Sequence, residues 1–270
     1  MQASLHVAVI QMNARLDVAA NLATAERLVR EAAEAGAQWV LLPELFNCYG
    51  PLEEVVQQAE PIPGPTSQRL AGLARELQIY LCAGSICEQS ATPGKGYNTS
   101  LLLAPSGDTV GCYRKLHLFD VEIPGQFRVT ESQAMLPGDK VVLTALPLGR
   151  VGQAICYDLR FPELFRALVD QRLEILAIPS AFTASTGRDH WEVLLRARAI
   201  ESQCYVLAPN QFGAHGAGLA SYGGSLIIDP WGKVLARAAL DKAEILHAEL
   251  HDDVLMQVRR RLPALAHRRL

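Results

Sequence analysis

The sequence predicts a single α/β domain whose sheets contain both parallel and antiparallel strands. Strand and helix patterns alternate along all 270 residues, and no shift in composition divides them. The turn sequence Pro105-Ser106-Gly107-Asp108 lies between two strand patterns and predicts an antiparallel hairpin. The first strand pattern is not followed by G-x-G-x-x-G, which disfavours a dinucleotide-binding fold. We therefore treat residues 1–270 as one domain.

The N-terminal half is expected to contain two helices and three strands before the hairpin. Residues 17–35 place their apolar side chains on one helical face, and Gly36 is suited to end that helix. Thr66 or Ser67 is expected to cap a second helix that runs to Leu77. The expected strands are residues 5–12, 39–42 and 79–86, and the expected hairpin strands are 97–104 and 109–115.

The C-terminal half begins with residues 116–140, which are punctuated by proline and glycine and predict a long loop. Loops of that length in compact domains are usually functional. The sequence Asp229-Pro230-Trp231-Gly232 predicts a turn. We expect strands at 141–156, 174–179, 204–208, 224–229 and 243–250, and helices at 161–171, at 189–202 and near the C-terminus.

Composition and charge exclude several classes of function. Half of the residues are hydrophobic, the net charge is −3 and the pI is about 6.2, so there is no general electrostatic attraction to nucleic acids or membranes. The six cysteines form no C-x-x-C pair and no zinc-like spacing with histidine. No signal peptide or membrane-length apolar stretch is apparent. We therefore expect a cytoplasmic protein with reduced thiols.

Cys156 is the residue that points most directly to chemistry. It ends an apolar strand pattern that begins at Val151, and Asp158 is expected to cap the helix that follows. A cysteine at a strand-to-helix turn lies near free N–H groups and the positive end of a helix dipole, which favour a thiolate and can hold an oxyanion. The alternative is a small, buried apolar side chain.

Three further residues are candidates, each with a less specific alternative. Glu44 follows the apolar sequence Val40-Leu41-Leu42-Pro43, where burial would raise its pKa and suit it to proton transfer, although it could simply begin a helix. Lys115 ends a hairpin strand and could be an ordinary surface lysine. Glu131 lies in the long loop and could be a solvated acid.

Taken together, these residues lie in three motifs that resemble the nitrilase superfamily of carbon–nitrogen hydrolases. The motifs are Pro43-Glu44-Leu45-Phe46, Tyr113-Arg114-Lys115-Leu116-His117-Leu118 and Cys156-Tyr157-Asp158-Leu159-Arg160-Phe161-Pro162-Glu163. Further segments at 120–132, 190–206, 221–223 and 229–232 resemble the Nit amidase branch. The resemblance extends over essentially the whole chain.

The resemblance implies a four-layer α-β-β-α sandwich and a Glu–Lys–Cys mechanism without metal or cofactor. Cys156 would attack an amide carbonyl and form a thioester, Glu44 would carry protons, and Glu131 would position Lys115 or the substrate. Lys115 and the N–H of Tyr157 would hold the oxyanion. Family members usually dimerise, and the helices that begin near 161 and 189 would form the interface.

The resemblance also implies a small anionic substrate, the ω-amide of a 2-oxo acid, which is cut to an acid and an amine. We expect deaminated glutathione, with 2-oxoglutaramate as the alternative. Arg160 would bind a substrate carboxylate unless it pairs with Glu163 or another acid and stabilises the turn, and Tyr49 and Tyr157 are expected beside the substrate. A nitrilase, an N-carbamoyl hydrolase and a non-catalytic module with a redox-sensitive thiol remain competing hypotheses.

Overall fold

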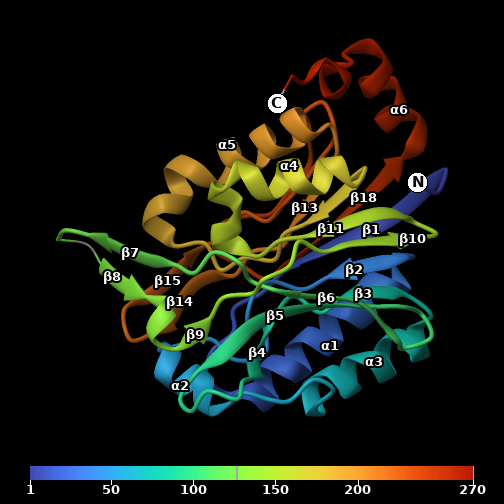
Figure 1. Cartoon of the computed structure of the whole chain (residues 1–270). Coiled ribbons are helices and arrows are strands. Elements are labelled where there is room, and N and C mark those ends of the chain that lie inside the picture. Colours follow the sequence, from blue (N-terminus) through green and yellow to red (C-terminus); the bar gives the residue numbers. More distant parts are fainter. Residues whose placement is uncertain (126, 270) are drawn as a thin grey trace.

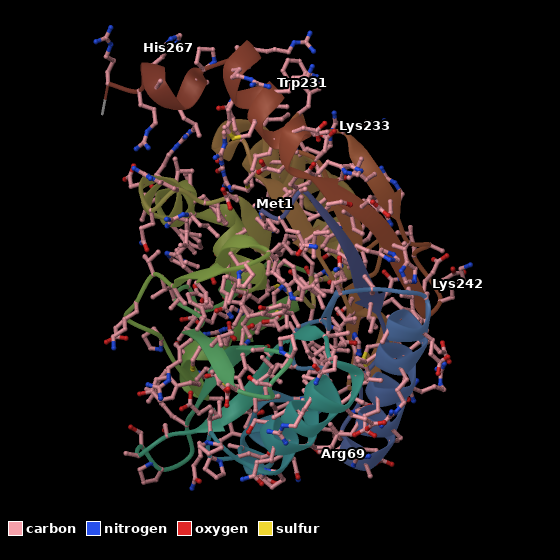
Figure 2. The ribbon with its side chains drawn as sticks, turned by 90° about the vertical axis from the view of Figure 1, so that its right-hand side faces the viewer. Met1, Arg69, Trp231, Lys233, Lys242 and His267 are labelled. Carbon is pink, nitrogen blue, oxygen red and sulfur yellow. The ribbon has the colours of Figure 1, made fainter. Side chains whose placement is uncertain are left out.

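Two β-sheets pack face to face in the computed structural model, which describes residues 1–125 and 127–269. The helices α1 (Val18–Glu34) and α3 (Pro65–Leu77) cover the outer face of one sheet, and α4 (Pro162–Asp170) and α5 (Ala184–Ser202) cover the other (Figure 1). Arg69 on α3 and the surface residue Trp231 lie at opposite ends of the view in Figure 2. The four-layer α-β-β-α sandwich is therefore confirmed.

The first sheet has the strand order β18-β1-β2-β3-β5-β4, and β6 and β9 also pair with β5. Strands β1, β2 and β3 are parallel, whereas β18 and β5 pair antiparallel at either side of them. The strands are β1 (Ser4–Gln11), β2 (Trp39–Leu41), β3 (Tyr80–Cys82), β4 (Ile86–Gln89), β5 (Gly96–Leu103), β6 (Thr109–Arg114), β9 (Met135–Leu136) and β18 (Glu244–His251).

The second sheet has the order β10-β11-β12-β13-β16-β17, with β11, β12 and β13 parallel. Its strands are β10 (Leu143–Leu146), β11 (Gly149–Gln153), β12 (Ile175–Ala177), β13 (Tyr205–Ala208), β16 (Leu226–Ile228) and β17 (Val234–Arg237). Two separate hairpins lie outside the sheets: β7 (Asp120–Ile123) with β8 (Phe127–Thr130), and β14 (Phe212–Gly216) with β15 (Leu219–Tyr222). The remaining helices are α2 (Leu52–Gln57) and α6 (Asp252–Arg261).

The continuous apolar runs of the central strands follow from burial on both faces. In β1, Val7 and Val9 pack between the two sheets, whereas Ala8 and Ile10 face the helices. The same alternation occurs in β13, where Tyr205 and Leu207 face the other sheet and their neighbours face α4 and α5. Among the described residues, no helix combines the length and apolar character needed to cross a membrane.

Several element boundaries differ from those expected. The second helix is capped by Gly64 and not by Thr66 or Ser67, because the Ser67 side chain accepts a hydrogen bond from the Gly64 N–H. The strand expected at 79–86 is two strands, separated at Gly84, whose φ of 49° and contact with the Pro43 carbonyl oxygen leave no room for a side chain. The helix expected from residue 189 begins at Ala184.

The prediction of a long loop at 116–140 is wrong for its described part. This segment contains the β7–β8 hairpin, a short 3₁₀-helix (Glu131–Gln133) and β9, while residue 126 lies outside the described residues. The β14–β15 hairpin and β17 were also not expected. Both hairpins are partly polar and half-exposed, so they lack the apolar pattern that revealed the core strands.

Candidate active site

All seven predicted site residues line one cavity of about 700 Å³ at an end of the sandwich. The cavity wall includes the ends of strands from both sheets, the β7–β8 hairpin, the tip of the β14–β15 hairpin and the first turn of α5. The predicted residues are Glu44, Tyr49, Lys115, Glu131, Cys156, Tyr157 and Arg160. Residues up to 116 positions apart in the sequence, from 44 to 160, therefore meet around one space.

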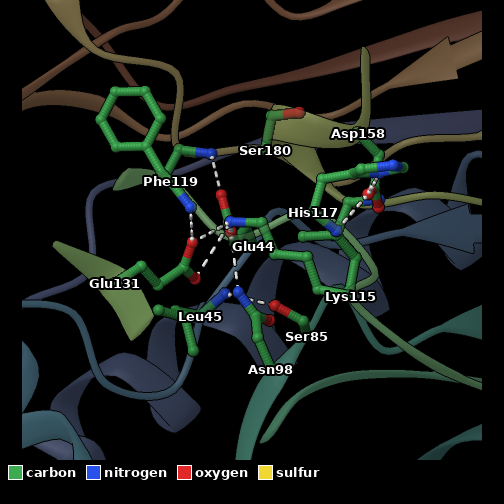
Figure 3. Close-up of polar contacts among 12 residues, drawn as sticks. Glu44, Leu45, Ser85, Asn98, Lys115, His117, Phe119, Glu131, Asp158 and Ser180 are labelled. Atoms are coloured by element: carbon green, nitrogen blue, oxygen red, sulfur yellow. Dashed lines mark hydrogen bonds and ion pairs between the residues drawn. The ribbon is translucent and has the colours of Figure 1, made fainter. Parts of the chain in front are cut away.

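Glu44 is held as a buried hydrogen-bond acceptor just beyond the end of β2. Its Oε1 accepts from Asn98 Nδ2 at 2.8 Å and from Lys115 Nζ at 3.1 Å, and its Oε2 accepts from the Ala181 N–H at 2.7 Å (Figure 3). Its side chain is only 5% exposed. Three donors from separate elements fix both carboxylate oxygens, which gives the group a single orientation.

Lys115 follows β6 and lies between two carboxylates. Its Nζ donates to Glu44 and to both Glu131 oxygens, at 3.1 Å and 2.9 Å (Figure 3). Burial alone lowers the pKa of Lys115, but Glu131 and Glu44 outweigh burial and hold the pKa well above its ordinary value. The side chain is therefore an ammonium ion that is only 3% exposed, and not the surface lysine of the alternative interpretation.

Glu131 begins the 3₁₀-helix after the β7–β8 hairpin and is also buried. Its Oε2 accepts from the Phe119 N–H at 2.6 Å as well as from Lys115. This carboxylate therefore connects the segment after β6 to the lysine, and it is not a solvated loop acid. With Glu44 and Lys115 it forms a buried cluster of two carboxylates and one ammonium.

Cys156 lies between β11 and α4, at the first residue of a 3₁₀-helix (Cys156–Arg160), with a φ of 46°. Its N–H donates to the Pro179 carbonyl at 3.0 Å. Burial and the charge of Glu44 raise the pKa of its thiol well above the ordinary value, although Lys115 and the Ala181 N–H oppose them. The expected preference for a thiolate is thus wrong: the free protein holds a thiol beside a carboxylate.

Asp158 does not cap α4, because Phe161 occupies the position before that helix. Its fully buried carboxylate instead accepts from the Tyr113 hydroxyl at 2.7 Å, the Ile155 N–H at 2.8 Å and the His117 N–H at 3.0 Å. It also contacts His117 Nδ1 at 2.7 Å. No sequence pattern predicted this network, since its members belong to different motifs.

Arg160 contacts aromatic rings and a histidine. Its Nη1 lies 3.2 Å from His190 Nδ1, and its guanidinium lies over the Phe182 ring at 5.1 Å and the Tyr157 ring at 5.9 Å. Among the described residues, the alternative ion pair with Glu163 is not formed. Arg160 therefore lines the cavity as a cation that no carboxylate of this region neutralises.

Sequence reasoning missed other parts of the cavity. Tyr49 was expected there, but its edge-on contact with the His215 ring, at 4.4 Å between centroids, was not. Asn98 and the Ala181 N–H, both donors to Glu44, also carry no motif. Asn98 lies on β5, a strand that is buried along almost its whole length, so neither a motif nor a pattern of exposure marks it.

Comparisons with known proteins agree with this geometry. The carbon-nitrogen hydrolase family model matches residues 6–260. The chain is 43% identical to the deaminated glutathione amidase of Synechocystis sp. over 97% of each chain, and 38% identical to the human omega-amidase NIT2 over 98% of this chain and 95% of that one. The crystal structure of the C. elegans NitFhit protein matches 99% of this chain and 66% of its own, with 37% identity and a TM-score of 0.93. The chain belongs to the carbon–nitrogen hydrolase family and is an enzyme that acts on carbon–nitrogen bonds.

Proposed function

We propose that this enzyme is a cysteine-dependent amidase that cleaves the ω-amide of a small, anionic 2-oxo acid, and that deaminated glutathione is its substrate. The observation that carries the proposal is the placement of a thiol, a carboxylate and a buried ammonium at one cavity. The relatives named deaminated glutathione amidase support the substrate, at 43–44% identity against 38% for the human omega-amidase.

Acylation of Cys156 is the first half of the proposed reaction. The sulfur attacks the amide carbonyl carbon while Glu44 accepts the thiol proton, and the carbonyl π electrons move to the oxygen. Lys115 and the N–H of Tyr157 hold this oxyanion. Glu44 then donates its proton to the amide nitrogen, the C–N bond breaks, and the amine leaves behind a thioester. Because the resting thiol is protonated, its proton is transferred during the attack and not before it.

Hydrolysis of the thioester is the second half. Glu44 accepts a proton from water as the water oxygen attacks the thioester carbonyl, and the same two donors hold the new oxyanion. The C–S bond breaks, the sulfur regains a proton from Glu44, and the acid leaves. Glu44 thus transfers protons in both halves of the reaction, and its three hydrogen-bond donors keep its carboxylate in one orientation throughout.

The charges at the cavity favour a substrate with more than one carboxylate. Arg160 lines the cavity beside Tyr157, and we propose that it binds the carboxylate next to the 2-oxo group. Arg128, which is 70% exposed on the β7–β8 hairpin, lies at the rim. We propose that it meets the second carboxylate, at the far end of deaminated glutathione. Gly218 and Ala220 also line the cavity, and their small size leaves space for the substrate.

The test compares substrates side by side. Cleavage of the ω-amide in deaminated glutathione or in 2-oxoglutaramate yields 2-oxoglutarate, so one product assay gives kcat/KM for both. We expect a higher value for deaminated glutathione. An equal or higher value for 2-oxoglutaramate would make the protein an ω-amidase, and turnover of only a nitrile or an N-carbamoyl amino acid would refute the reaction itself.

A variant at the rim separates the two amides further. Arg128→Ala should raise KM for deaminated glutathione by about 2- to 5-fold, the usual range for an exposed charge pair. It should leave KM for 2-oxoglutaramate unchanged, because that molecule lacks the second carboxylate. Arg128→Lys is the matched control, since it keeps the charge without the guanidinium fork. Equal effects on both substrates would contradict this role for Arg128.

We also propose that the protein is a homodimer joined through α4 and α5. The α5 side chains of Val193 and Ile200 are 59% and 46% exposed. Trp231, which is 56% exposed, lies in a turn beside α5, because the next residue, Gly232, accepts a hydrogen bond through its carbonyl from Arg196 of α5. Exposed apolar surface of this kind favours association. Light scattering should give a dimer for the native chain and a monomer for Ile200→Asp; a native monomer would refute the proposal.

We propose that the enzyme works in the cytoplasm, without a nucleic-acid or membrane partner. The reaction needs Cys156 as a free thiol, and a reducing compartment maintains that state. The small negative net charge gives no general attraction to polyanions. Cell fractionation with an antibody to the protein would test the location, and recovery in a membrane or extracellular fraction would contradict it.

A further inference from the structure

We propose that Asp158 is a positioning residue that fixes Lys115 relative to Cys156. Nothing in the proposed reaction uses Asp158, yet its carboxylate is fully buried and joins the two chain segments that carry the lysine and the cysteine. The proposal rests on the proposed amidase reaction for its kinetic test, whereas its alkylation test needs no substrate.

Asp158 forms a hydrogen bond across Cys156, with the residue that precedes it in the chain. It is two residues after Cys156 in the same 3₁₀-helix, and its Oδ2 accepts at 2.8 Å from the N–H of Ile155, the residue before Cys156. The backbone at Cys156 has a φ of 46°, a conformation that side chains other than glycine rarely adopt. A hydrogen bond that spans this residue therefore holds the turn in the conformation that presents the sulfur.

The same carboxylate accepts hydrogen bonds from residues on both sides of Lys115 in the chain. Its Oδ2 accepts at 2.7 Å from the hydroxyl of Tyr113, two residues before the lysine. Its Oδ1 accepts at 3.0 Å from the N–H of His117, two residues after the lysine, and lies 2.7 Å from His117 Nδ1 (Figure 3). The His117 ring stacks on Phe161, with centroids 3.8 Å apart, so its orientation is fixed from the α4 side as well.

These contacts leave little freedom between the two reactive groups. The donors to Asp158 come from both segments, and Tyr113 and Asp158 are themselves fully buried, so water cannot replace a lost bond. A displacement of about 1 Å between catalytic groups can lower a rate about 100-fold. Asp158 is thus a short, rigid connection between the group that attacks the substrate and the group that holds the oxyanion.

Asp158→Asn is the direct test. The amide keeps the size of the side chain but replaces one acceptor oxygen by an NH₂ group. Both Asp158 oxygens accept from backbone N–H groups, so this NH₂ group would lie against another donor and a hydrogen bond would be lost. We expect kcat to fall about 100-fold with little change in KM. The pH profile of Cys156 alkylation by iodoacetamide should move up by about one unit, because Lys115 lowers the pKa of that thiol and would be held less closely.

Two further variants keep the proposal testable if Asp158→Asn fails to fold. His117→Leu and His117→Asn have nearly the same shape, but only the amide of Asn can donate near the position of Nδ1. We expect His117→Leu to lower kcat about 10-fold, the effect of a net hydrogen bond of ordinary strength, and His117→Asn to recover most of that loss. Equal kcat values for the two variants would overturn the proposal.

Asp229→Asn is the matched control for stability. Asp229 is also a buried aspartate that accepts two backbone N–H bonds, from Trp231 and Lys233, but it lies in a remote turn. The Asp229→Asn variant should unfold at a lower temperature but keep the native pH profile of Cys156 alkylation. A folded Asp158→Asn with unchanged kcat and unchanged alkylation would overturn the proposal. If the native protein cleaved neither amide, the proposed function would fail, while the alkylation profiles would still decide the role of Asp158.

Discussion

Replacing Glu131 by glutamine tests whether Lys115 must be held by two carboxylates. Glutamine has the same shape as glutamate but is neutral and has a single oxygen. In the native protein the Glu131 oxygens accept from Lys115 Nζ at 3.1 Å and 2.9 Å, and Oε2 also accepts from the Phe119 N–H at 2.6 Å. The glutamine oxygen can keep the Phe119 bond and one lysine bond. Its NH₂ group would then lie against the Lys115 ammonium, and because both groups only donate, no hydrogen bond forms between them.

The expected effect follows from the burial of this pair. Both side chains are at most 5% exposed, so solvent screens their interaction little. A hydrogen bond to a charged group contributes about 1.5–3 kcal/mol. If that energy is lost where Lys115 holds the oxyanion, kcat falls about 10- to 150-fold. KM should change little, because the interaction strengthens in the transition state and not in the bound substrate.

The assay is steady-state formation of 2-oxoglutarate, with urea unfolding measured alongside. Glu88→Gln is the matched control, because Glu88 is also buried and accepts from Arg114 at 2.6 Å and 2.8 Å, outside the residues that line the cavity. This control should lose stability but keep kcat. An unchanged kcat in Glu131→Gln, or a rise in KM alone, would refute a role for Glu131 in holding Lys115 for catalysis.

Four other changes have distinct expected outcomes. Cys156→Ser should reduce turnover at least 100-fold with the fold intact, since a hydroxyl ionises far less readily than a thiol; residual activity above that level would exclude Cys156 as the nucleophile. Glu44→Gln should lower kcat and yet move iodoacetamide alkylation of Cys156 to lower pH, because the charge of Glu44 raises the pKa of that thiol; a shift to higher pH would contradict the account. The folded pKa of Cys156 lies above its ordinary value of 9.0, so its contribution to stability is complete below pH 9 and is lost as pH rises further. Cys156→Ala should therefore flatten the fall of unfolding free energy above pH 9, as measured by urea titration. Arg160→Ala should raise KM; unfolding instead would show that its contact with Phe182 is structural.

The fold and the cluster of reactive residues could be predicted because both leave local signals. Central strands such as β1 and β13 are buried on both faces, and their apolar runs are visible in the sequence. Glu44, Lys115 and Cys156 each lie in a compact motif at a strand end. The hairpins β7–β8 and β14–β15 could not be predicted in this way, since their half-exposed strands lack a regular apolar pattern.

The protonation state of Cys156 also could not be predicted from its neighbours in sequence. The local turn and the following helix suggested a thiolate, but the carboxylate that reverses this preference belongs to Glu44, far away in the chain. The contacts of Arg160 also depend on folding: Glu163 was the alternative partner that its sequence neighbours offered, whereas His190 and Phe182 contact the guanidinium. Charges and rings brought together only by folding decide both cases.

Mass spectrometry of the acyl-enzyme tests the central claim most directly. Native enzyme and Glu44→Gln would be mixed with deaminated glutathione, quenched in acid within the first turnover, and digested for peptide mapping. The account predicts a 2-oxoglutaryl thioester on Cys156 of the native enzyme, with one equivalent of amine already released. It predicts far less of this adduct on Glu44→Gln, which lacks the carboxylate that accepts the thiol proton. Product formation without an adduct on Cys156, or an adduct on another residue, would contradict it.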